Sequence, residues 1–278
     1  MPYVSTRAGR VHYRERGEGT PVVMLHATLH DHHDFDAVAP GLAERYRTIT
    51  VDWPWHGESE SPRAPQKPGV TLFAEVLQDV VTNLGLPPAF FIGNSVGGFS
   101  AARLAITHPD RVRGLVMVNA GGFVSWNPLT RSSARLLGVP SVTRLLMPRL
   151  VNSYMRARTP EDAAIVRRVV ARAKTREGAR TAAAIWREFP TPGHDLRGRV
   201  GELRAPTLLV WGALDPVLPL RAGRVTHETI PGSRLEVFQA GHVVFSSEPD
   251  AFLAVVRSFF ETVTGGDSFE TVTGGDSR

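Results

Sequence analysis

One serine lies in a glycine-rich turn between a strand-like segment and a helix-like segment. The turn spans residues 93–98 and reads GNSVGG; the apolar run 89–92 precedes it and a helix-like run, 99–107, follows it. A strand and a helix joined by so short a turn must approach closely, and glycines two residues before and after Ser95 leave space for that approach. Such a turn strains the serine backbone and leaves its hydroxyl clear of the chain, near the positive end of the helix. The turn therefore favours an α/β fold with a nucleophilic serine.

Apolar runs and amphipathic segments alternate along most of the chain. Continuous apolar runs such as residues 21–25 are typical of strands that are buried on both faces of a parallel sheet. Further strand-like segments occur at residues 47–52, 89–92, 112–118, 207–211 and 235–238. Helical spacing occurs at residues 35–46, 70–84, 99–107 and 251–260, and residues 3–7 and 11–15 alternate like a hairpin with its turn at 9–10. We predict an α/β fold with a mostly parallel sheet flanked by helices. In the helix expected from residue 70, Thr71 is the predicted N-cap and Gly85 the stop signal.

The alternation breaks after residue 120, and the next long stretch has only helical patterns. Residues 128–188 contain 12 Arg and one Lys against four acidic residues, a net charge of +9 by this count, whereas the whole chain carries +5. We interpret most of this charge as a solvated helical surface, with steering of anionic substrates as the alternative. The predicted parts are an α/β core (1–127 and 191–262), a helical cap or lid (128–190) and a tail (263–278).

The C-terminal residues contain a perfect duplication. The nine residues 260–268 read FETVTGGDS, and residues 269–277 repeat them. Paired glycines in each copy favour a flexible extension, to which we assign no function.

Composition limits the classes of protein to which the chain can belong. Its 278 residues contain no cysteine, which excludes disulfides, thiolate metal sites and a cysteine nucleophile. The first residues lack the apolar core of a signal peptide, and no apolar run approaches the length of a membrane span. We therefore expect a cytoplasmic protein with a small-molecule substrate, without a membrane span and without nucleic-acid binding. The sequence gives no indication of the oligomeric state.

Two further residues suit a serine that acts as a nucleophile. A serine hydroxyl needs a base beside it, and His242 follows the last predicted strand, at the end where open α/β sheets carry their sites. Asp215 follows the preceding strand and would orient the imidazole and stabilise its charged form. The order serine, aspartate, histidine is that of the α/β-hydrolases.

The chain resembles the α/β-hydrolase superfamily over residues 10–262. Four segments carry this resemblance, namely GNSVGG at 93–98, WGALDPV at 211–217, AGH at 240–242 and DWPWHGES at 52–59. The resemblance implies that Ser95 is the nucleophile, His242 the base and Asp215 its orienting acid. It also implies an oxyanion hole made by the backbone N–H groups of Val96 and Thr28, although Ala27 replaces the glycine that is usual in the loop before Thr28.

The same resemblance leaves several reactions open. The leading hypothesis is hydrolysis of a carboxylic ester in a small to medium-sized apolar substrate. Hydrolysis of a carbon–carbon bond in a ring-fission dienoate is the alternative, because Asn94 and the glycine pair 121–122 are similar to those hydrolases. Val243 in place of their tryptophan and a less glycine-rich oxyanion loop depart from them. A slow or non-catalytic ligand receptor with this fold is a further alternative.

Aromatic residues in segments expected to face the site suggest an apolar substrate pocket. The candidate substrate-binding residues are Trp53, Trp55, Asn94, Phe123, Trp126, Trp186 and Phe245. Four histidines also cluster with two aspartates, but their spacing matches no ligand pair on a helix or strand. They are His26, His30, His32 and His33, with Asp31 and Asp34. We expect His26 and His56 to be structural and the protein to need no metal and no cofactor.

Overall fold

The computed structural model describes residues 2–62 and 66–270, and in these residues eight strands form one sheet in the order β1-β2-β4-β3-β5-β6-β7-β8. The strands are β1 (Tyr3–Thr6), β2 (Gly9–Arg16), β3 (Pro21–Leu25), β4 (Arg47–Val51), β5 (Ala89–Asn94), β6 (Val112–Val118), β7 (Thr207–Gly212) and β8 (Arg234–Phe238). β1, β2 and β4 pair antiparallel, and all other neighbours pair parallel. The predicted α/β fold with a mostly parallel sheet is confirmed.

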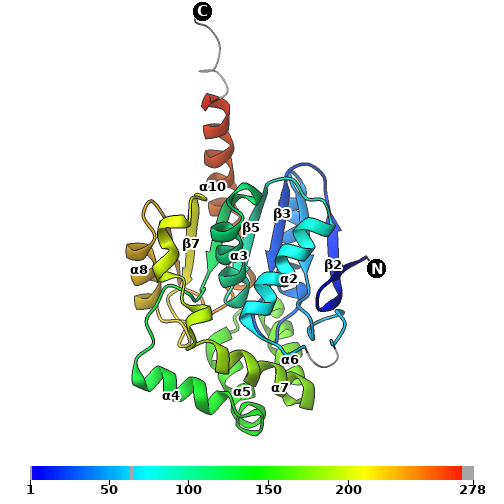
Figure 1. Ribbon diagram of the computed structural model, residues 1–278, viewed down its shortest axis with the longest axis vertical. Coiled ribbons are helices and arrows are strands. Elements are labelled where there is room, and N and C mark those ends of the chain that lie inside the picture. The colour runs from blue at the N-terminus through cyan, green and yellow to red at the C-terminus, as the bar shows by residue number, and fades with distance from the viewer. Residues whose placement is uncertain (1, 63–65, 271–278) are drawn as a thin grey trace, which may run out of the picture.

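Helices cover both faces of the sheet (Figure 1). α2 (Val70–Asn83) and α3 (Val96–Thr107) pack on one face, while α1 (Ala39–Ala43) and α10 (Pro249–Glu270) pack on the other. Alternate residues of the central strands belong to two separate cores, as the two-residue period of a strand requires. On β5, Phe91 joins the core under α2 and α3, whereas Phe90 and Ile92 join the core under α1 and α10. Double-sided burial explains why these strands read as continuous apolar runs.

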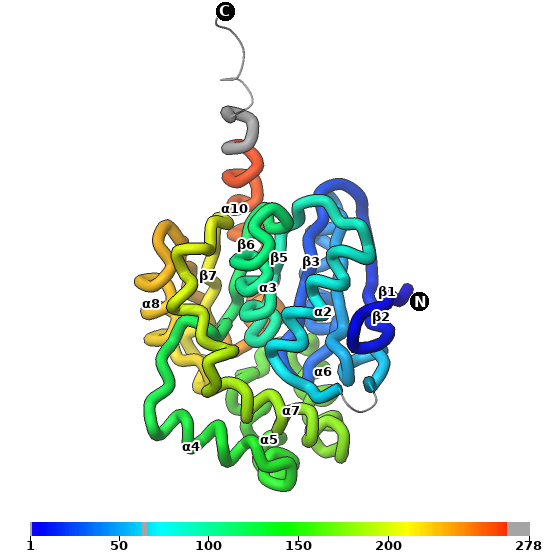
Figure 2. Tube along the Cα trace, in the orientation of Figure 1, coloured from blue at the N-terminus to red at the C-terminus, as the bar shows by residue number. Residues whose placement is uncertain are grey.

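Four consecutive helices lie together at one end of the sheet (Figure 1). They are α4 (Pro128–Leu137), α5 (Pro140–Met155), α6 (Pro160–Lys174) and α7 (Arg176–Glu188), named here the α4–α7 segment. Figure 2 follows the chain from β6 into this segment and back to β7. The segment is thus an insertion between two neighbouring strands, and it covers the end of the sheet at which β6 finishes.

The remaining short helices occupy the connections. They are the 3₁₀ turns η1 (His32–Phe35), η2 (Pro109–Arg111), η3 (Pro192–His194) and η4 (Arg197–Glu202), with α8 (Leu220–Thr229) and α9 (Val244–Ser247). α8 lies close to β7, where a Cβ on Gly223 would come within 2.5 Å of the Trp211 ring. The glycine therefore allows the close approach of helix and strand.

Two helices differ from the sequence prediction. The segment 35–46 was expected to be one helix, but η1 ends at Phe35 and α1 begins only at Ala39. Pro40 explains this gap, because proline fits the first turn of a helix and not its interior. α2 has Gly69 as its N-cap instead of Thr71, and the carboxylate of Glu188 accepts a hydrogen bond from the backbone N–H of Val70.

The C-terminal helix is longer than the sequence indicated. α10 continues to Glu270, so the first copy of the repeat, expected to be a flexible tail, lies on this helix. Val263 packs against the core, which favours continued helix at this position. The second copy of the repeat continues from residue 271 onward, outside the described residues.

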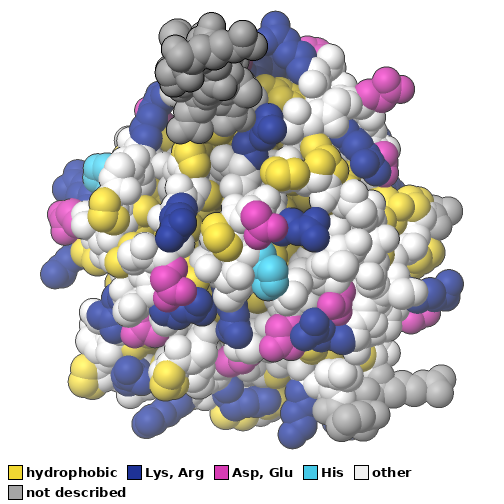
Figure 3. All heavy atoms as spheres, turned by 45° about the horizontal axis from the view of Figure 1, so that its top comes forward, with side chains coloured by type: hydrophobic (Ala, Val, Ile, Leu, Met, Phe, Trp, Pro, Cys, Tyr) yellow, Lys and Arg dark blue, Asp and Glu magenta, His cyan; other side chains and the backbone are white. Residues whose placement is uncertain are grey.

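On the face of the molecule in Figure 3, basic side chains are scattered among acidic, apolar and uncharged ones.

Candidate active site

Ser95 has a strained backbone at the turn between β5 and α3. Its backbone angles, φ of 55° and ψ of −114°, lie in a region that residues other than glycine rarely adopt. A Cβ on Gly93 would lie 2.4 Å from the Gly97 carbonyl oxygen, and one on Gly97 would lie 2.3 Å from the Leu25 carbonyl oxygen. The two glycines therefore let β5, α3 and β3 meet at van der Waals distance, as the sequence motif predicts.

His242 and Asp215 form a buried hydrogen-bonded pair. His242 Nδ1 lies 2.6 Å from Asp215 Oδ2, and the two residues are 4% and 3% exposed. Asp215 also accepts hydrogen bonds from the side chain of Asn119 at 2.7 Å and from the backbone N–H of Val217 at 2.8 Å. Because an ionised carboxylate only accepts hydrogen bonds, this arrangement favours a proton on His242 Nδ1 and leaves Nε2 free to accept one.

Asn119 was not identified from the sequence. It follows β6, has a φ of 41°, and its side-chain oxygen accepts a hydrogen bond from the backbone N–H of Gly212. One amide thus fixes both the carboxylate of Asp215 and the end of β7. Its position directly after a parallel strand was the available signal, because sites in such sheets form at the strand ends.

Ser95 and His242 line one cavity of about 40 Å³ between the sheet and the α4–α7 segment. The lining residues are Ala27, Thr28, Ser95, Met147, Tyr154, Trp186, Phe189, Val217 and His242. Ligand pockets usually measure at least about 300 Å³, so this cavity is contracted. Binding of anything larger than a few atoms requires the α4–α7 segment to move or its side chains to rotate.

The α4–α7 segment is bonded directly to the loop that carries His242. The Tyr154 carbonyl accepts a hydrogen bond from the backbone N–H of His242 at 2.8 Å. A Cβ on Gly241 would lie 2.2 Å from that same carbonyl oxygen, so only glycine fits there. Asp162 at the start of α6 accepts hydrogen bonds from the hydroxyls of Ser246 and Ser247. The position of the histidine loop therefore depends on the segment above it.

A second buried histidine meets the cavity wall through Tyr154. His30 Nδ1 lies 2.6 Å from Asp34 Oδ2, and His30 Nε2 lies 2.9 Å from the Tyr154 hydroxyl. All three residues are at most 4% exposed, and burial raises the pKa of Tyr154 well above its usual value. The tyrosine hydroxyl is therefore protonated at neutral pH. Sequence patterns gave no signal for this contact, because it arises only when α5 meets the loop after β3.

The loop after β3 holds Thr28 in the cavity wall, and Val96 is the first residue of α3. The left-handed residue of this loop is Leu29, with φ of 72°, whereas Ala27 is absent from the non-glycine positive-φ residues of the described chain. Alanine at position 27 therefore does not strain the loop. His56 Nε2 accepts a hydrogen bond from the Leu29 backbone N–H and fixes the loop from below.

His26 has the structural role that was expected for it. Its Nε2 accepts a hydrogen bond from the Trp53 backbone N–H, and its Nδ1 lies 2.7 Å from the Ala27 carbonyl oxygen. Burial lowers the pKa of His26 below its usual value, and burial together with the charge of Arg172 lowers that of His56 further. Both imidazoles are therefore neutral connectors of the loops after β3 and β4.

Of the predicted substrate-binding residues, Trp186 lines the cavity and the others do not. Trp53 stacks on Phe73 with ring centroids 5.0 Å apart, and Phe245 stacks on Phe35 at 4.6 Å, so both belong to the hydrophobic core. Phe123 is also completely buried in the core.

The other three candidates lie outside the set of residues that line the cavity. Trp55 belongs to the loop after β4, where its side chain is buried in the core and its φ is 63°. The side-chain amide of Asn94 donates to the carbonyls of His242 and Val118, so it braces the histidine loop. Trp126 is half-buried and stacks on Phe189, which itself lines the cavity.

Asp52 organises a separate polar cluster. Burial raises the pKa of Asp52, but hydrogen bonds from His12 and His32 outweigh this and hold it well below its usual range. His12, His32 and Glu58 are the described residues whose ligand atoms are close enough together to hold a metal ion. The cluster lies outside the set of residues that line the Ser95 cavity.

Comparison with known proteins agrees with this architecture. Residues 20–249 match the family model of the alpha/beta hydrolase fold. A 2-hydroxy-6-oxononadienedioate/2-hydroxy-6-oxononatrienedioate hydrolase of Paraburkholderia phymatum is 31% identical over 251 residues, which cover 84% of each chain. An esterase from Exiguobacterium antarcticum is similar in structure, with a TM-score of 0.79 and 26% identity over 92% of this chain and 98% of the other.

The enol-lactonase from Burkholderia xenovorans LB400 has the same fold, with a TM-score of 0.79 and 23% identity over 93% of this chain and 99% of the other. Among the described residues, no helix is both long and apolar enough to cross a membrane. The family model covers most of the sequence, including the α4–α7 segment. The chain therefore belongs to the α/β-hydrolase fold family.

Proposed function

We propose that this protein is a serine hydrolase that cleaves carboxylic esters in small to medium-sized apolar substrates, with Ser95, His242 and Asp215 as its catalytic triad. The observation that carries the proposal is the 2.6 Å contact between His242 Nδ1 and Asp215, made by a histidine that shares its cavity with Ser95. Sequence order, the strained serine and the buried acid all agree with these roles.

In this mechanism His242 Nε2 accepts the Ser95 hydroxyl proton while the serine oxygen attacks the ester carbonyl. Asp215 stabilises the imidazolium that forms, and the backbone N–H groups of Val96 and Thr28 stabilise the oxyanion. His242 then returns the proton to the leaving alcohol, which leaves an acyl group on Ser95. A water molecule activated by the same histidine hydrolyses this acyl-enzyme.

The α4–α7 segment acts in this proposal as a cap over the acyl pocket. Met147, Tyr154 and Trp186 come from the segment and supply one side of the cavity wall. Because the cavity is small, the proposal favours short acyl groups and an opening movement for larger ones.

The test combines turnover and covalent labelling. Hydrolysis of p-nitrophenyl butyrate is measured for the wild type, Ser95→Ala and His242→Asn. Ser100→Ala is the control, because Ser100 is a buried serine in α3, the helix that begins directly after Ser95. A fluorophosphonate probe should modify Ser95, as located by peptide mass spectrometry. Loss of turnover in the first two variants and labelling at Ser95 support the proposal. Equal turnover in wild type and Ser95→Ala would defeat it.

A ligand receptor is the outcome indicated by a different pattern. In that case neither wild type nor variant turns over any ester, and both bind the same ligand. Labelling at Ser95 without multiple turnovers would indicate an enzyme whose acyl intermediate is hydrolysed slowly.

Carbon–carbon hydrolysis of a dienoate is a second candidate. It is favoured by the 31% identity to a hydrolase named for 2-hydroxy-6-oxononadienedioate, over 84% of both chains. The basic α4–α7 segment would suit an anionic substrate. Comparison of kcat/KM for a 2-hydroxy-6-oxo-dienoate with that for p-nitrophenyl butyrate decides between the two, since both reactions use Ser95.

A further inference from the structure

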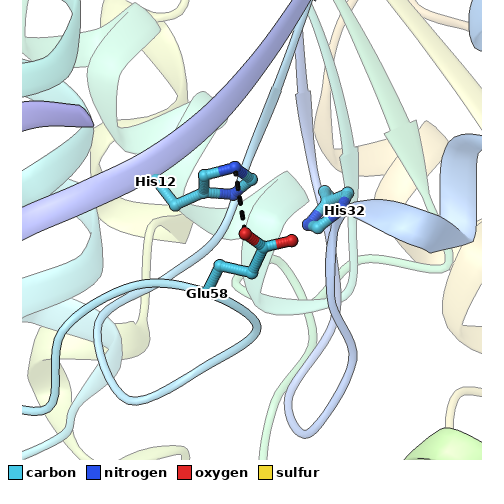
Figure 4. Close-up of side chains that lie close together, drawn as sticks. All are labelled: His12, His32 and Glu58. Atoms are coloured by element: carbon cyan, nitrogen blue, oxygen red, sulfur yellow. Dashed lines mark ion pairs between the residues drawn. The ribbon is translucent and has the colours of Figure 1, made fainter. Parts of the chain in front are cut away.

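Two histidines far apart in the sequence converge on one aspartate. His12 lies on β2, His32 opens η1, and Asp52 follows β4. Nδ1 of His12 and Nδ1 of His32 each lie 2.8 Å from Asp52 Oδ2. Figure 4 shows the carboxylate of Glu58 directed toward the space between the two imidazole rings.

The environment of Asp52 fixes which imidazole nitrogens carry protons. The backbone N–H of His32 donates to Asp52 Oδ1, and that of Glu58 donates to Oδ2. Both oxygens therefore already act as acceptors, and an ionised carboxylate accepts from each Nδ1–H as well. Neutral imidazoles protonated at Nδ1 have a lone pair at Nε2, the form in which histidine binds a metal.

Both Nε2 atoms lack a hydrogen-bond partner among the described residues. His12 is 0% exposed and His32 is 2% exposed, and each Nε2 atom is buried without such a partner. Buried polar atoms without partners are rare and destabilising in folded proteins. Glu58 Oε2 lies 3.7 Å from His12 Nε2, which is beyond hydrogen-bonding distance.

We propose that His12, His32 and Glu58 form a binding site for a divalent transition-metal ion of the Zn²⁺ class. Each of the three side chains offers one potential ligand atom, an imidazole nitrogen or a carboxylate oxygen, that lies within 4.8 Å of the other two. Two imidazole nitrogens and one carboxylate oxygen are a ligand set that Zn²⁺ uses, at about 2.0–2.2 Å from the ion. Asp52 supplies the carboxylate partner that ligating histidines commonly have on their other nitrogen.

Glu58 is the ligand that adjusts to the ion. Its side chain is 32% exposed, so it provides both an entry path and freedom to move. Oε1 of Glu58 lies 3.6 Å from Arg14, the neighbouring cation that an incoming metal would have to displace or accommodate. Within residues 26–34 the spacing predicts no metal site, but the fold brings His32 of this loop close to His12 on β2.

A metal ion here would join three separate pieces of the chain. These are the N-terminal hairpin through His12, the loop after β3 through His32, and the loop after β4 through Glu58. The role is therefore stabilisation of the fold beside the loop that carries Thr28. It does not depend on the proposed hydrolase reaction, so failure of either proposal leaves the other standing.

The test uses tag-free full-length protein that has been treated with EDTA and desalted. Titration with ZnCl₂ by isothermal calorimetry should give saturable binding of one equivalent, and the melting temperature should rise with added Zn²⁺. Glu58→Gln removes the carboxylate charge, and His32→Asn keeps a donor toward Asp52 while removing Nε2. Each variant should weaken Zn²⁺ binding at least about tenfold, as loss of a metal-site residue commonly does.

Matched controls lie next to these ligands. Glu60→Gln changes a carboxylate on the same loop that pairs with Arg10, and His33→Asn changes the adjacent histidine, which pairs with Asp36. Both controls should bind Zn²⁺ as the wild type does. No saturable binding by the wild type, or unchanged affinity in Glu58→Gln, would overturn the proposal. Because Glu58 is partly exposed, this variant serves even if His32→Asn does not fold.

Discussion

The hydroxyl oxygen of Tyr154 lies 2.9 Å from Nε2 of His30. Since His30 Nδ1 faces Asp34, His30 Nε2 is the acceptor and the tyrosine hydroxyl is the donor. The bond links α5 to the loop after β3, and both partners are buried. It is therefore a point at which the α4–α7 segment is held against the sheet.

Tyr154→Phe should destabilise the fold, because it leaves His30 Nε2 buried without a donor. The expected decrease in the free energy of unfolding is about 1–3 kcal/mol, measured by urea denaturation at pH 7.5. Tyr46→Phe is the control, since it removes the hydroxyl of another mostly buried tyrosine, for which no hydrogen bond is found within the described part of the chain. Equal stability of Tyr154→Phe and wild type would contradict a structural role for this bond.

Asn119→Ala should lower kcat with little change in KM. The substitution removes a hydrogen bond to the Asp215 carboxylate at a position that does not line the cavity, so it acts through the orientation of His242. A hydrogen bond to a charged group contributes about 1.5–3 kcal/mol, which corresponds to roughly tenfold or more in rate. Steady-state kinetics with p-nitrophenyl butyrate measure this. Asn83→Ala, at an exposed asparagine, is the control, and a change confined to KM would refute the positioning role.

Trp186→Ala should shift the preference toward longer acyl chains. Trp186 forms part of the wall of a small cavity, and truncation of its ring enlarges that cavity. In the wild type, kcat/KM should fall from the butyryl to the decanoyl p-nitrophenyl ester, whereas in the variant the fall should be smaller. Trp126→Ala, which removes an indole from outside the lining, should keep the wild-type profile. Activity independent of chain length in the wild type would argue against a restrictive pocket.

Ser95→Gly should abolish activity and raise stability. The serine backbone has positive φ, and such strain costs about 1–3 kcal/mol, whereas glycine adopts this conformation freely. The extra flexibility of glycine in the unfolded chain offsets about 0.4–1 kcal/mol, so a net gain on the order of 1 kcal/mol is expected in urea denaturation. Ser100→Gly, inside α3, should instead lose stability. A destabilised Ser95→Gly would show that the hydroxyl, not the backbone, dominates at this position.

Protonation of His194 should reduce stability at acid pH. The ring lies between Phe99 and Phe189, and its burial lowers the pKa of His194 from 6.5 to about 4. Between these values the unfolded chain binds a proton that the folded protein does not, so stability falls as pH decreases through this window and levels off below it. A shift of this size is worth up to about 3 kcal/mol.

The measurement compares the free energy of unfolding of wild type and His194→Gln between pH 7.5 and 4.5. The variant should lose less stability over this range than the wild type does. His227→Gln, at an exposed histidine, is the control and should follow the wild type. Parallel curves for wild type and His194→Gln would exclude a contribution from His194.

The sequence was sufficient to predict the sheet, the turn at Ser95 and the strand ends that carry Asp215 and His242. These features depend on local patterns, namely apolar runs, glycine spacing and residues directly after strands. The prediction of Thr71 as the N-cap of α2 was wrong. The N-cap is Gly69, and Glu188, more than one hundred residues away, accepts the hydrogen bond that a capping side chain would accept. Long-range partners of this kind leave no local signal.

The cavity wall was the least predictable part. Trp53 and Phe245 are of residue types that commonly line pockets, but large apolar side chains of the same types also fill the hydrophobic core, where both are found. Conversely, Met147, Tyr154 and Phe189 face the cavity only because of how α5 and α7 meet the sheet. The pairing of His12 with His32 likewise requires knowledge of which strands are neighbours.

The bonds from Tyr154 and Asp162 to the His242 loop restrict how this protein can be re-engineered. A chimera that imports the α4–α7 segment of a relative would also have to import a matching glycine and serine pair at positions 241, 246 and 247. Without the glycine, the transplanted helices would clash with the His242 loop. Without the serines, the carboxylate at position 162 would be buried without its hydrogen-bond donors. The α4–α7 segment and the His242 loop must therefore be exchanged together, although β7, α8 and β8 separate them along the chain.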